Sequence, residues 1–237
     1  MNQLLITRHF KSPKLKGVSD MERGIPDSEK IKAKVFGEEL IETYNLTDII
    51  GIETGMTRAR ESVEAMLGDK AKRIDTLHFT AVYPAEYIPS TGKSYDGPGG
   101  DISCVAEQML KGNDPETYTE LARNTAYGFL GIFGHVMRDI AINSKNNFVF
   151  SGHGDSEKTH LIELALVMGG KKQDKILNLV KDLGGSPKGS LSCRYVFAET
   201  EPTLYLGDET ITLGNTLSTL PRQYDVEKHF EAQKTSM

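Results

Sequence analysis

The sequence is poor in cysteine and has no long apolar run. Cys104 and Cys193 are the only two cysteines among 237 residues, so they could form one bridge but not a disulfide framework, and a reducing cytoplasm is expected. No apolar run approaches the roughly 18 residues of a membrane span. The apolar run at residues 4–6 is too short for a signal-peptide core. We therefore expect a cytoplasmic protein with no membrane partner.

An excess of positive charge is also missing. Lys and Arg total 28 against 33 Asp and Glu, for a net charge of -5. No global basic field would attract nucleic acid, although a local basic pocket for a small anion is still allowed. Hydrophobic residues make up 38% and charged residues 26% of the chain, which is typical of a soluble globular protein and excludes collagen-like, mucin-like or wholly disordered classes.

Strand-like and helix-like segments alternate along most of the chain. This order predicts an α/β fold, a three-layer α/β/α arrangement with a mostly parallel central sheet. The helix at 29–44 is expected to bury an apolar face of Ile31, Val35, Leu40 and Tyr44. The expected strands are 4–6, 48–52, 76–82, 148–152 and 194–198, with a hairpin at 203–213; the expected helices are 29–44, 58–67, 101–110, 116–143, 155–168 and 173–183.

The chain is interpreted as a single domain over 1–237. The stretch at about 83–115 contains many prolines and glycines in its first part, and is predicted to be a loop or lid insertion, because long loops in compact domains are often functional. The charged tail at about 221–237 is predicted to be mobile or bound at an interface. A homodimer through this tail or through the hairpin near Gly207 stays open.

Cationic and imidazole side chains follow three of the expected strands. They are Arg8-His9, Arg58 and His153. Ligands of parallel sheets bind beyond the carboxyl ends of the strands, so together these residues predict a pocket for a phosphate, whose oxygens match arginine. Taken singly each residue has a plainer interpretation: a solvated strand end, an ion pair of Arg58 with Glu61 or another surface acid, and a solvated loop histidine. Without acids or cysteines at ligand spacing, neither a metal nor another cofactor is expected.

These segments resemble a known family. Residues 4–12 (LLITRHFKS) resemble the first strand and Arg-His-Gly-Glu-Ser motif of the histidine phosphatase superfamily, also called phosphoglycerate mutase-like. Residues 54–62 (TGMTRARES) are similar to its Ser-Pro-Leu-x-Arg-Ala-x-x-Thr motif, and 148–154 (FVFSGHG) to its strand ending in His-Gly. The resemblance spans most of residues 3–200.

The resemblance implies a phosphatase that acts on a small phosphorylated substrate. His9 would become a phosphohistidine, and Arg8, Arg58 and His153 would hold the phosphoryl oxygens. Ser12 falls on the motif serine and would donate a hydrogen bond to phosphate.

The resemblance also implies an acid that protonates the leaving group. Many members have a Glu in the loop after the third strand, and Glu86 is the choice here, with Asp155 as the alternative.

The motifs depart from the family pattern near the nucleophile. Phe10 replaces the motif glycine after His9, Lys11 replaces the usual acid, and Leu15 stands where an Asn is expected. Phe10 is expected to crowd the pocket or to form an apolar wall. These departures argue against a glycolytic mutase. Two rivals nevertheless stay open: phosphoryl transfer to a second alcohol, and a catalytically silent protein that binds a phosphate ligand.

Overall fold

The computed structural model describes only part of the chain. The described residues are 1–77, 87–88, 93–94, 103–112, 136, 140, 145–153, 158, 161–162, 164–165, 168–182, 188–198 and 201–214. The chain divides into two compact units. The first comprises 1–79, 138–157 and 186–214, and the second comprises 80–137, 158–185 and 215–237. The predicted tail and most of the predicted insertion fall outside the described residues.

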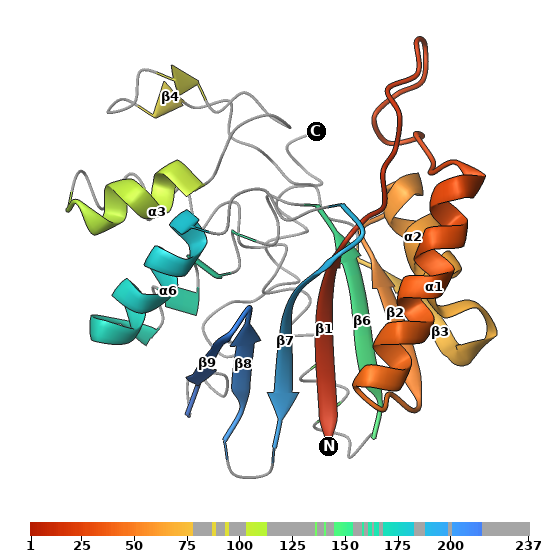
Figure 1. Cartoon of the computed structure of the whole chain (residues 1–237). Helices are drawn as coiled ribbons and strands as arrows, with labels where there is room; N and C mark the ends of the chain where they lie inside the picture. The colour runs from red at the N-terminus through yellow and green to blue at the C-terminus, as the bar shows by residue number, and fades with distance from the viewer. Residues whose placement is uncertain are drawn as a thin grey trace, which may run out of the picture. The chain divides into compact units, whose positions relative to one another are not determined.

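The first unit holds a seven-stranded sheet in the order β3-β2-β6-β1-β7-β8-β9 (Figure 1). Its pairings from β3 to β1 are parallel, and those from β1 to β9 are antiparallel. The sheet is thus parallel only in part, because β7, β8 and β9 are joined as a meander. The strands are β1 (Asn2–Arg8), β2 (Ile49–Glu53), β3 (Ala71–Thr76), β6 (Asn147–Gly152), β7 (Leu191–Phe197), β8 (Thr203–Leu206) and β9 (Glu209–Thr212).

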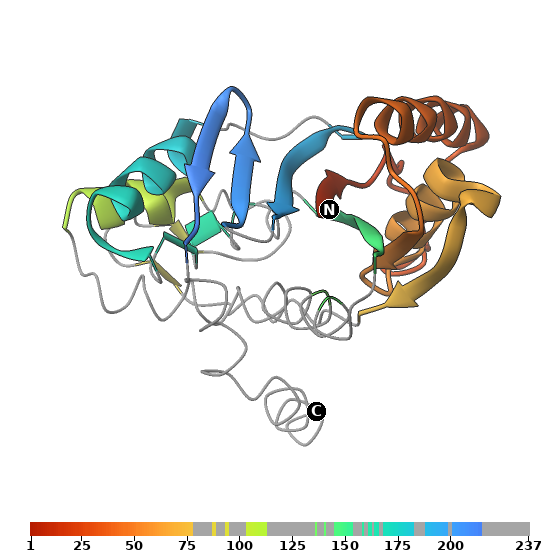
Figure 2. The same ribbon diagram turned by 90° about the horizontal axis from the view of Figure 1, so that it is seen from below.

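Two helices of the first unit lie side by side next to the parallel strands in both ribbon views (Figures 1 and 2). Helix α1 (Asp27–Thr43) packs on α2 (Thr57–Leu67), and α2 packs on β2, β3 and β6. The core between them includes Leu5, Val63 and Val149. The short 3-10 helix η1 (Gly68–Lys70) follows α2. This packing fixes the N-terminus of α2 at the carboxyl ends of the strands.

The second unit contains α3 (Ser103–Leu110) and α6 (Gly170–Asp182), which pack on each other, and the small antiparallel pair β4 (Tyr87–Ile88) and β5 (Lys93–Ser94). The described residues of the predicted helices 116–143 and 155–168 within this unit, which include Val136 and Lys158, are helical. None of the described helices has the length and apolar character needed to cross a membrane.

Most of the expected elements are present, including the hairpin with its turn at Gly207. Strand β3 was not predicted. It shares only Thr76 with the strand expected at 76–82, of which residues 78–82 lie outside the described residues. The sequence of β3, AKRIDT, alternates weakly and carries several charges, as is usual for an edge strand, so its pattern does not indicate a strand.

The apolar face predicted for α1 was right only in part. Leu40 is buried and Tyr44 packs against the core, but Ile31 and Val35 are 67% and 50% exposed. In their place the helix buries Ala33 and Gly37. A Cβ built on Gly37 would lie 2.0 Å from the carbonyl oxygen of Met66 in α2. Small residues therefore face α2 because the two backbones approach too closely for larger side chains.

The close approach at Gly37 yields a prediction with an unusual sign. Gly→Ala within a helix ordinarily stabilises by about 0.5–1 kcal/mol. Here Gly37→Ala is expected to lower the free energy of unfolding by about 1–3 kcal/mol, because α1 must move away from α2. Denaturant unfolding measures this change. Glu38→Ala, at the neighbouring exposed position, is the control and should be nearly neutral; equal stability of the Gly37→Ala protein would contradict the packing described.

Candidate functional site

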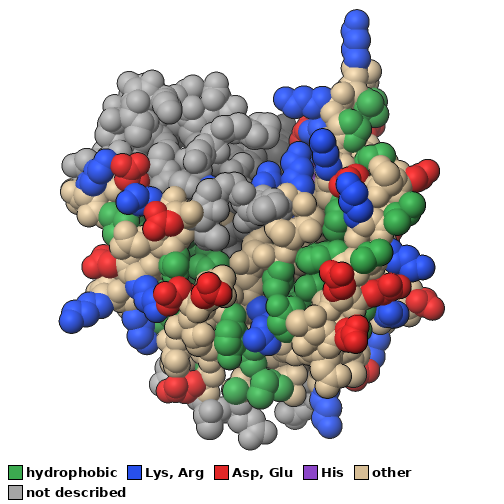
Figure 3. Space-filling view, in the orientation of Figure 1, with side chains coloured by type: hydrophobic (Ala, Val, Ile, Leu, Met, Phe, Trp, Pro, Cys, Tyr) green, Lys and Arg blue, Asp and Glu red, His purple; other side chains and the backbone are tan. Residues whose placement is uncertain are grey.

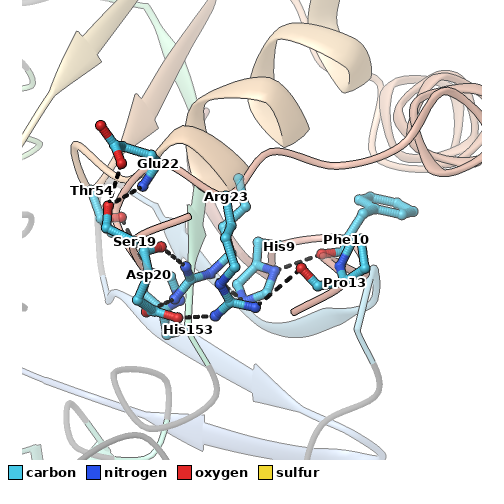
Figure 4. A network of polar contacts seen from close by, with 10 residues as sticks. His9, Phe10, Pro13, Ser19, Asp20, Glu22, Arg23, Thr54 and His153 are labelled. Carbon is cyan, nitrogen blue, oxygen red and sulfur yellow. Dashed lines mark hydrogen bonds and ion pairs between the residues drawn. The ribbon is translucent and has the colours of Figure 1, made fainter. Parts of the chain in front are cut away.

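The parallel pairing brings three strand ends together. β6 lies between β1 and β2, with Arg8 opposite Gly152 and Glu53 opposite Ser151. Each strand therefore ends at the same edge of the sheet. The residues that follow directly are His9 after β1, Thr54 after β2 and His153 after β6, and Figure 4 shows all three in one polar network.

His9 is held in one defined orientation. Its side chain is buried, and its backbone N–H donates to the carbonyl of Gly152 at 2.9 Å. The ring Nδ1 lies 2.6 Å from the carbonyl oxygen of Phe10. Because a carbonyl can only accept, Nδ1 carries the hydrogen, and Nε2 is left with its lone pair. Nε2 accepts a hydrogen bond from Nε of Arg58 at 3.3 Å.

His153 stands beside this imidazole. The two ring centroids are 4.9 Å apart with the planes at 61°. Nε2 of His153 lies 3.3 Å from Oγ1 of Thr54. Thr54 occupies the position of the motif serine, so the departure from the family pattern keeps a hydroxyl at this place. Two imidazoles thus line one side of the site.

Arg58 lies in the first turn of α2 and is buried. Ser62, one turn later, donates to the carbonyl of Arg58 at 2.6 Å and accepts from the backbone N–H of Phe10 at 3.0 Å. One hydroxyl thereby ties the helix that carries Arg58 to the segment that carries His9. The helix N-terminus adds its positive dipole end at the same place.

The partner of Arg58 is Asp20, not Glu61. Nη2 of Arg58 lies 2.8 Å from Oδ2 of Asp20. The other carboxylate oxygen of Asp20 accepts from Arg23. Glu61 instead accepts from the backbone N–H of Ile25 at 2.7 Å. The plainer alternative, an ion pair of Arg58 with a surface acid, is thus present, with Asp20 as the acid in place of Glu61.

Two further cations adjoin His9. Arg8 ends β1, and its backbone exchanges hydrogen bonds with the loop at 188–190: Arg8 N–H donates to the Ser190 carbonyl at 3.1 Å, and Gly189 N–H donates to the Arg8 carbonyl at 3.2 Å. This ladder brings Lys188 close to Arg8, although the two residues are far apart in sequence.

The electrostatic environment keeps both imidazoles neutral. Burial, and then the charges of Arg58, Lys188 and Arg8, lower the pKa of His9 to about 3, against a smaller opposing effect of the Phe10 carbonyl. The pKa of His153 is lowered well below its usual value, first by burial and then by the surrounding positive charges. Burial and the neighbouring Arg8 likewise lower the pKa of Lys188. A neutral His9 has the free lone pair that a nucleophile needs.

Ser12 and Phe10 are both buried. The Ser12 Oγ has no hydrogen-bond partner among the described residues. This hydroxyl is therefore available to donate a hydrogen bond to a ligand. The expectation for Phe10 was wrong: its ring belongs to the hydrophobic core, 5.9 Å from the ring of Phe36. A Cβ on Gly189 would lie 2.5 Å from the Phe10 ring, so the aromatic ring fills space that a side chain at 189 would need.

The two candidate acids, Glu86 and Asp155, lie outside the described residues. No group of three His, Cys, Asp or Glu side chains in the described part of the chain could hold a metal ion. Apart from the Asp20 carboxylate, the described side chains around His9 are nitrogen groups and hydroxyls, a set suited to an anion.

Sequence reasoning missed three charged residues of the site: Asp20, Arg23 and Lys188. Asp20 and Arg23 lie in the loop between β1 and α1, and Lys188 lies just before β7. None belongs to a periodic pattern or to a motif. The spacing of Asp20 and Arg23, three residues apart within a turn-forming segment, was the only available signal, and it is common in loops.

Comparisons with known proteins bear on the fold. No family model matches the sequence, and no curated protein matches it. Solved structures do match. The mycobacterial glucosyl-3-phosphoglycerate phosphatase is 14% identical with a TM-score of 0.50, over 87% of this chain and 98% of that chain. The chain therefore shares the fold of this phosphatase. The fold that the resemblance of the three motifs implied is thus confirmed.

Two other solved structures match to a comparable extent. The phosphoserine phosphatase of Entamoeba histolytica is 18% identical, with a TM-score of 0.48, over 86% of this chain and 95% of that chain. The YhfR protein of Bacillus stearothermophilus is 14% identical, with a TM-score of 0.49, over 87% and 96%.

The neutral state of His9 predicts how stability depends on pH. Its pKa is about 3 in the folded protein against an ordinary value of 6.5. The unfolded chain therefore binds a proton that the folded chain does not, and the free energy of unfolding falls as pH is lowered from about 6.5 towards 3, by at most about 1.4 kcal/mol per pH unit. Denaturant unfolding at several pH values should show a shallower loss for His9→Gln than for the wild type. Parallel profiles of the two proteins would contradict this.

Proposed function

We propose that the protein hydrolyses a small phosphomonoester, without a metal, through a phosphohistidine on His9. The observation that carries the proposal is the orientation of this imidazole. Its Nδ1 hydrogen is held by the Phe10 carbonyl, and its Nε2 lone pair faces the buried guanidinium of Arg58. A phosphoryl group whose oxygens bind that guanidinium would therefore place its phosphorus next to Nε2, in position for attack.

The cationic groups around His9 would bind the phosphoryl oxygens. Arg8, Arg58 and His153 would stabilise the charge spread over these oxygens in the transition state, and Ser12 would add a hydroxyl donor. The lowered pKa values of the two imidazoles are consistent with this: burial is the main cause, and the nearby positive charges lower them further. An incoming phosphate would compensate that charge.

The reaction would proceed in two displacements. In the first, the bond between His9 Nε2 and phosphorus forms, the bond from phosphorus to the leaving oxygen breaks, and an acid gives that oxygen a proton. In the second, water attacks phosphorus, its proton passes to the same carboxylate, and the bond to Nε2 breaks to release inorganic phosphate. Glu86 is the proposed acid, with Asp155 as the alternative.

The first test is phosphate release from a panel of phosphomonoesters in the presence of a chelator. His9→Ala is expected to abolish turnover, because no other group replaces the nucleophile. His153→Ala and Arg58→Gln are expected to lower turnover by about 10²- to 10⁴-fold through lost stabilisation of the transition state.

Arg60→Gln is the matched control for Arg58→Gln, because Arg60 lies in the same helical turn and is exposed. It should retain full activity. Near-wild-type turnover by the His9→Ala protein would refute the covalent mechanism, and loss of wild-type turnover with the chelator would indicate a metal.

The leaving group distinguishes the two candidate acids. Alkyl phosphates need a proton on the departing oxygen, whereas aryl phosphates with an acidic phenol do not. Glu86→Gln should therefore reduce kcat/KM for an alkyl phosphate far more than for 4-nitrophenyl phosphate, and Asp155→Asn should affect both alike. The reverse pattern would assign the proton donor to Asp155, and equal losses in both variants would exclude both residues as the sole donor.

A further inference from the structure

All three nitrogens of the Arg58 guanidinium are engaged within the protein. Nε donates to Nε2 of His9 at 3.3 Å, Nη1 donates to the backbone carbonyl of Asp20 at 2.5 Å, and Nη2 donates to Oδ2 of Asp20 at 2.8 Å. Asp20 accepts one hydrogen from each terminal nitrogen, out of the five N–H donors of the guanidinium. A phosphoryl group that binds the two terminal nitrogens bidentately therefore competes with Asp20 for the same end of the guanidinium.

The Asp20 carboxylate joins two arginines. While Oδ2 accepts from Arg58, Oδ1 accepts from Nη2 of Arg23. Figure 4 shows Asp20 and Arg23 within the same network as His9 and His153. Two oxygens bridging two guanidiniums is an arrangement that a phosphoryl group can also adopt. The carboxylate therefore holds a place that fits part of the ligand.

Asp20 is the exposed member of this cluster. Its side chain is 43% exposed, whereas those of Arg58 and Arg23 are 7% and 13% exposed. Asp20 lies in a turn in which Ser19 and Glu22 bond each other at 2.7 Å, and the next residue, Met21, accepts from the N–H of Thr57 at 3.0 Å. Arg58 is thus buried and Arg23 is half-buried, while the carboxylate comes to them from the surface.

The loop carrying Asp20 stands out from the rest of its unit. Figure 1 shows it rising from the end of β1 before the chain enters α1, and Figure 3 shows Lys and Arg side chains projecting from it. Lys14 and Lys16 are exposed there. An acidic side chain directed from this basic loop into a cationic site is placed to neutralise that site.

We propose that Asp20 is an internal ligand of the phosphoryl site, which the phosphoryl group of the substrate displaces, and that Arg23 then binds this group together with Arg58. The inference rests on the proposed function and adds to it an exchange of one anion for another. The carboxylate holds the two guanidiniums in place before the substrate arrives. Its removal from them opposes binding, so a protein without this charge binds phosphate more tightly.

The experiment measures the dissociation constant of inorganic phosphate by calorimetry for the full chain. Asp20→Asn keeps the shape of the side chain and removes its charge. It should tighten phosphate binding by about 3- to 30-fold, the range expected for losing charge-assisted bonds to a partly exposed carboxylate. Glu22→Gln is the matched control: it makes the same change of charge two residues away, at a carboxylate that bonds Ser19 instead of an arginine, and should leave the affinity nearly unchanged.

The second arm tests Arg23. Arg23→Gln in the Asp20→Asn background should weaken phosphate binding by 10-fold or more, whereas Arg60→Gln in the same background should not. Thermal unfolding of each variant verifies that it is folded, and Asp20→Ser replaces Asp20→Asn if the latter is not.

The outcomes distinguish a failure of this inference from a failure of the proposed function. Tighter binding by Asp20→Asn but not by Glu22→Gln, with loss on Arg23→Gln, supports the inference. Unchanged or weaker binding by Asp20→Asn overturns it and leaves the proposed function intact. No change on Arg23→Gln overturns the part assigned to that arginine. Failure of the wild type to bind phosphate overturns the proposed function and this inference together.

Discussion

The parallel pairing of β6 with both β1 and β2 is the constraint on which the site depends. His9, Thr54 and His153 are 45 and 99 residues apart along the chain, yet each needs only to follow its strand to arrive at the same edge. Buried apolar side chains fix the register, because a slip of one residue would turn every core side chain outward. The chemistry at the edge is thus positioned by packing in the middle of the sheet, not by contacts among the polar groups themselves.

What those contacts add is orientation. The Phe10 carbonyl selects the tautomer of His9, and Ser62 joins the helix of Arg58 to the same backbone segment. The helix N-terminus, the arginines and Lys188 then surround the imidazoles with positive charge. Such an arrangement is unfavourable by itself, and the described structure balances part of it with the Asp20 carboxylate. The stability of the site and its affinity for anions have the same electrostatic origin.

The sequence predicted the parts of the protein that local pattern controls. The strand ends at Arg8 and His153 and the helix beginning near Arg58 could be located because apolar runs stop abruptly at polar residues. Part of the α1 face and strand β3 escaped prediction for physical reasons: α1 approaches α2 through Gly37, which an apolar pattern does not indicate, and an edge strand carries charge in place of apolar alternation. Asp20, Arg23 and Lys188 escaped prediction because tertiary contacts alone bring loops to His9.

The packing of Phe10 against Gly189 links two positions that lie in the backbone ladder beside the nucleophile. Volume gained at position 10 is volume that position 189 cannot use, since even a methyl group there would overlap the aromatic ring. The two positions therefore share one compartment of fixed size. Gly189 also has a φ of +71°, a backbone conformation that by itself favours glycine. Among relatives of this chain, position 189 should therefore stay glycine even where position 10 is small, because the aromatic ring is only one of its two constraints.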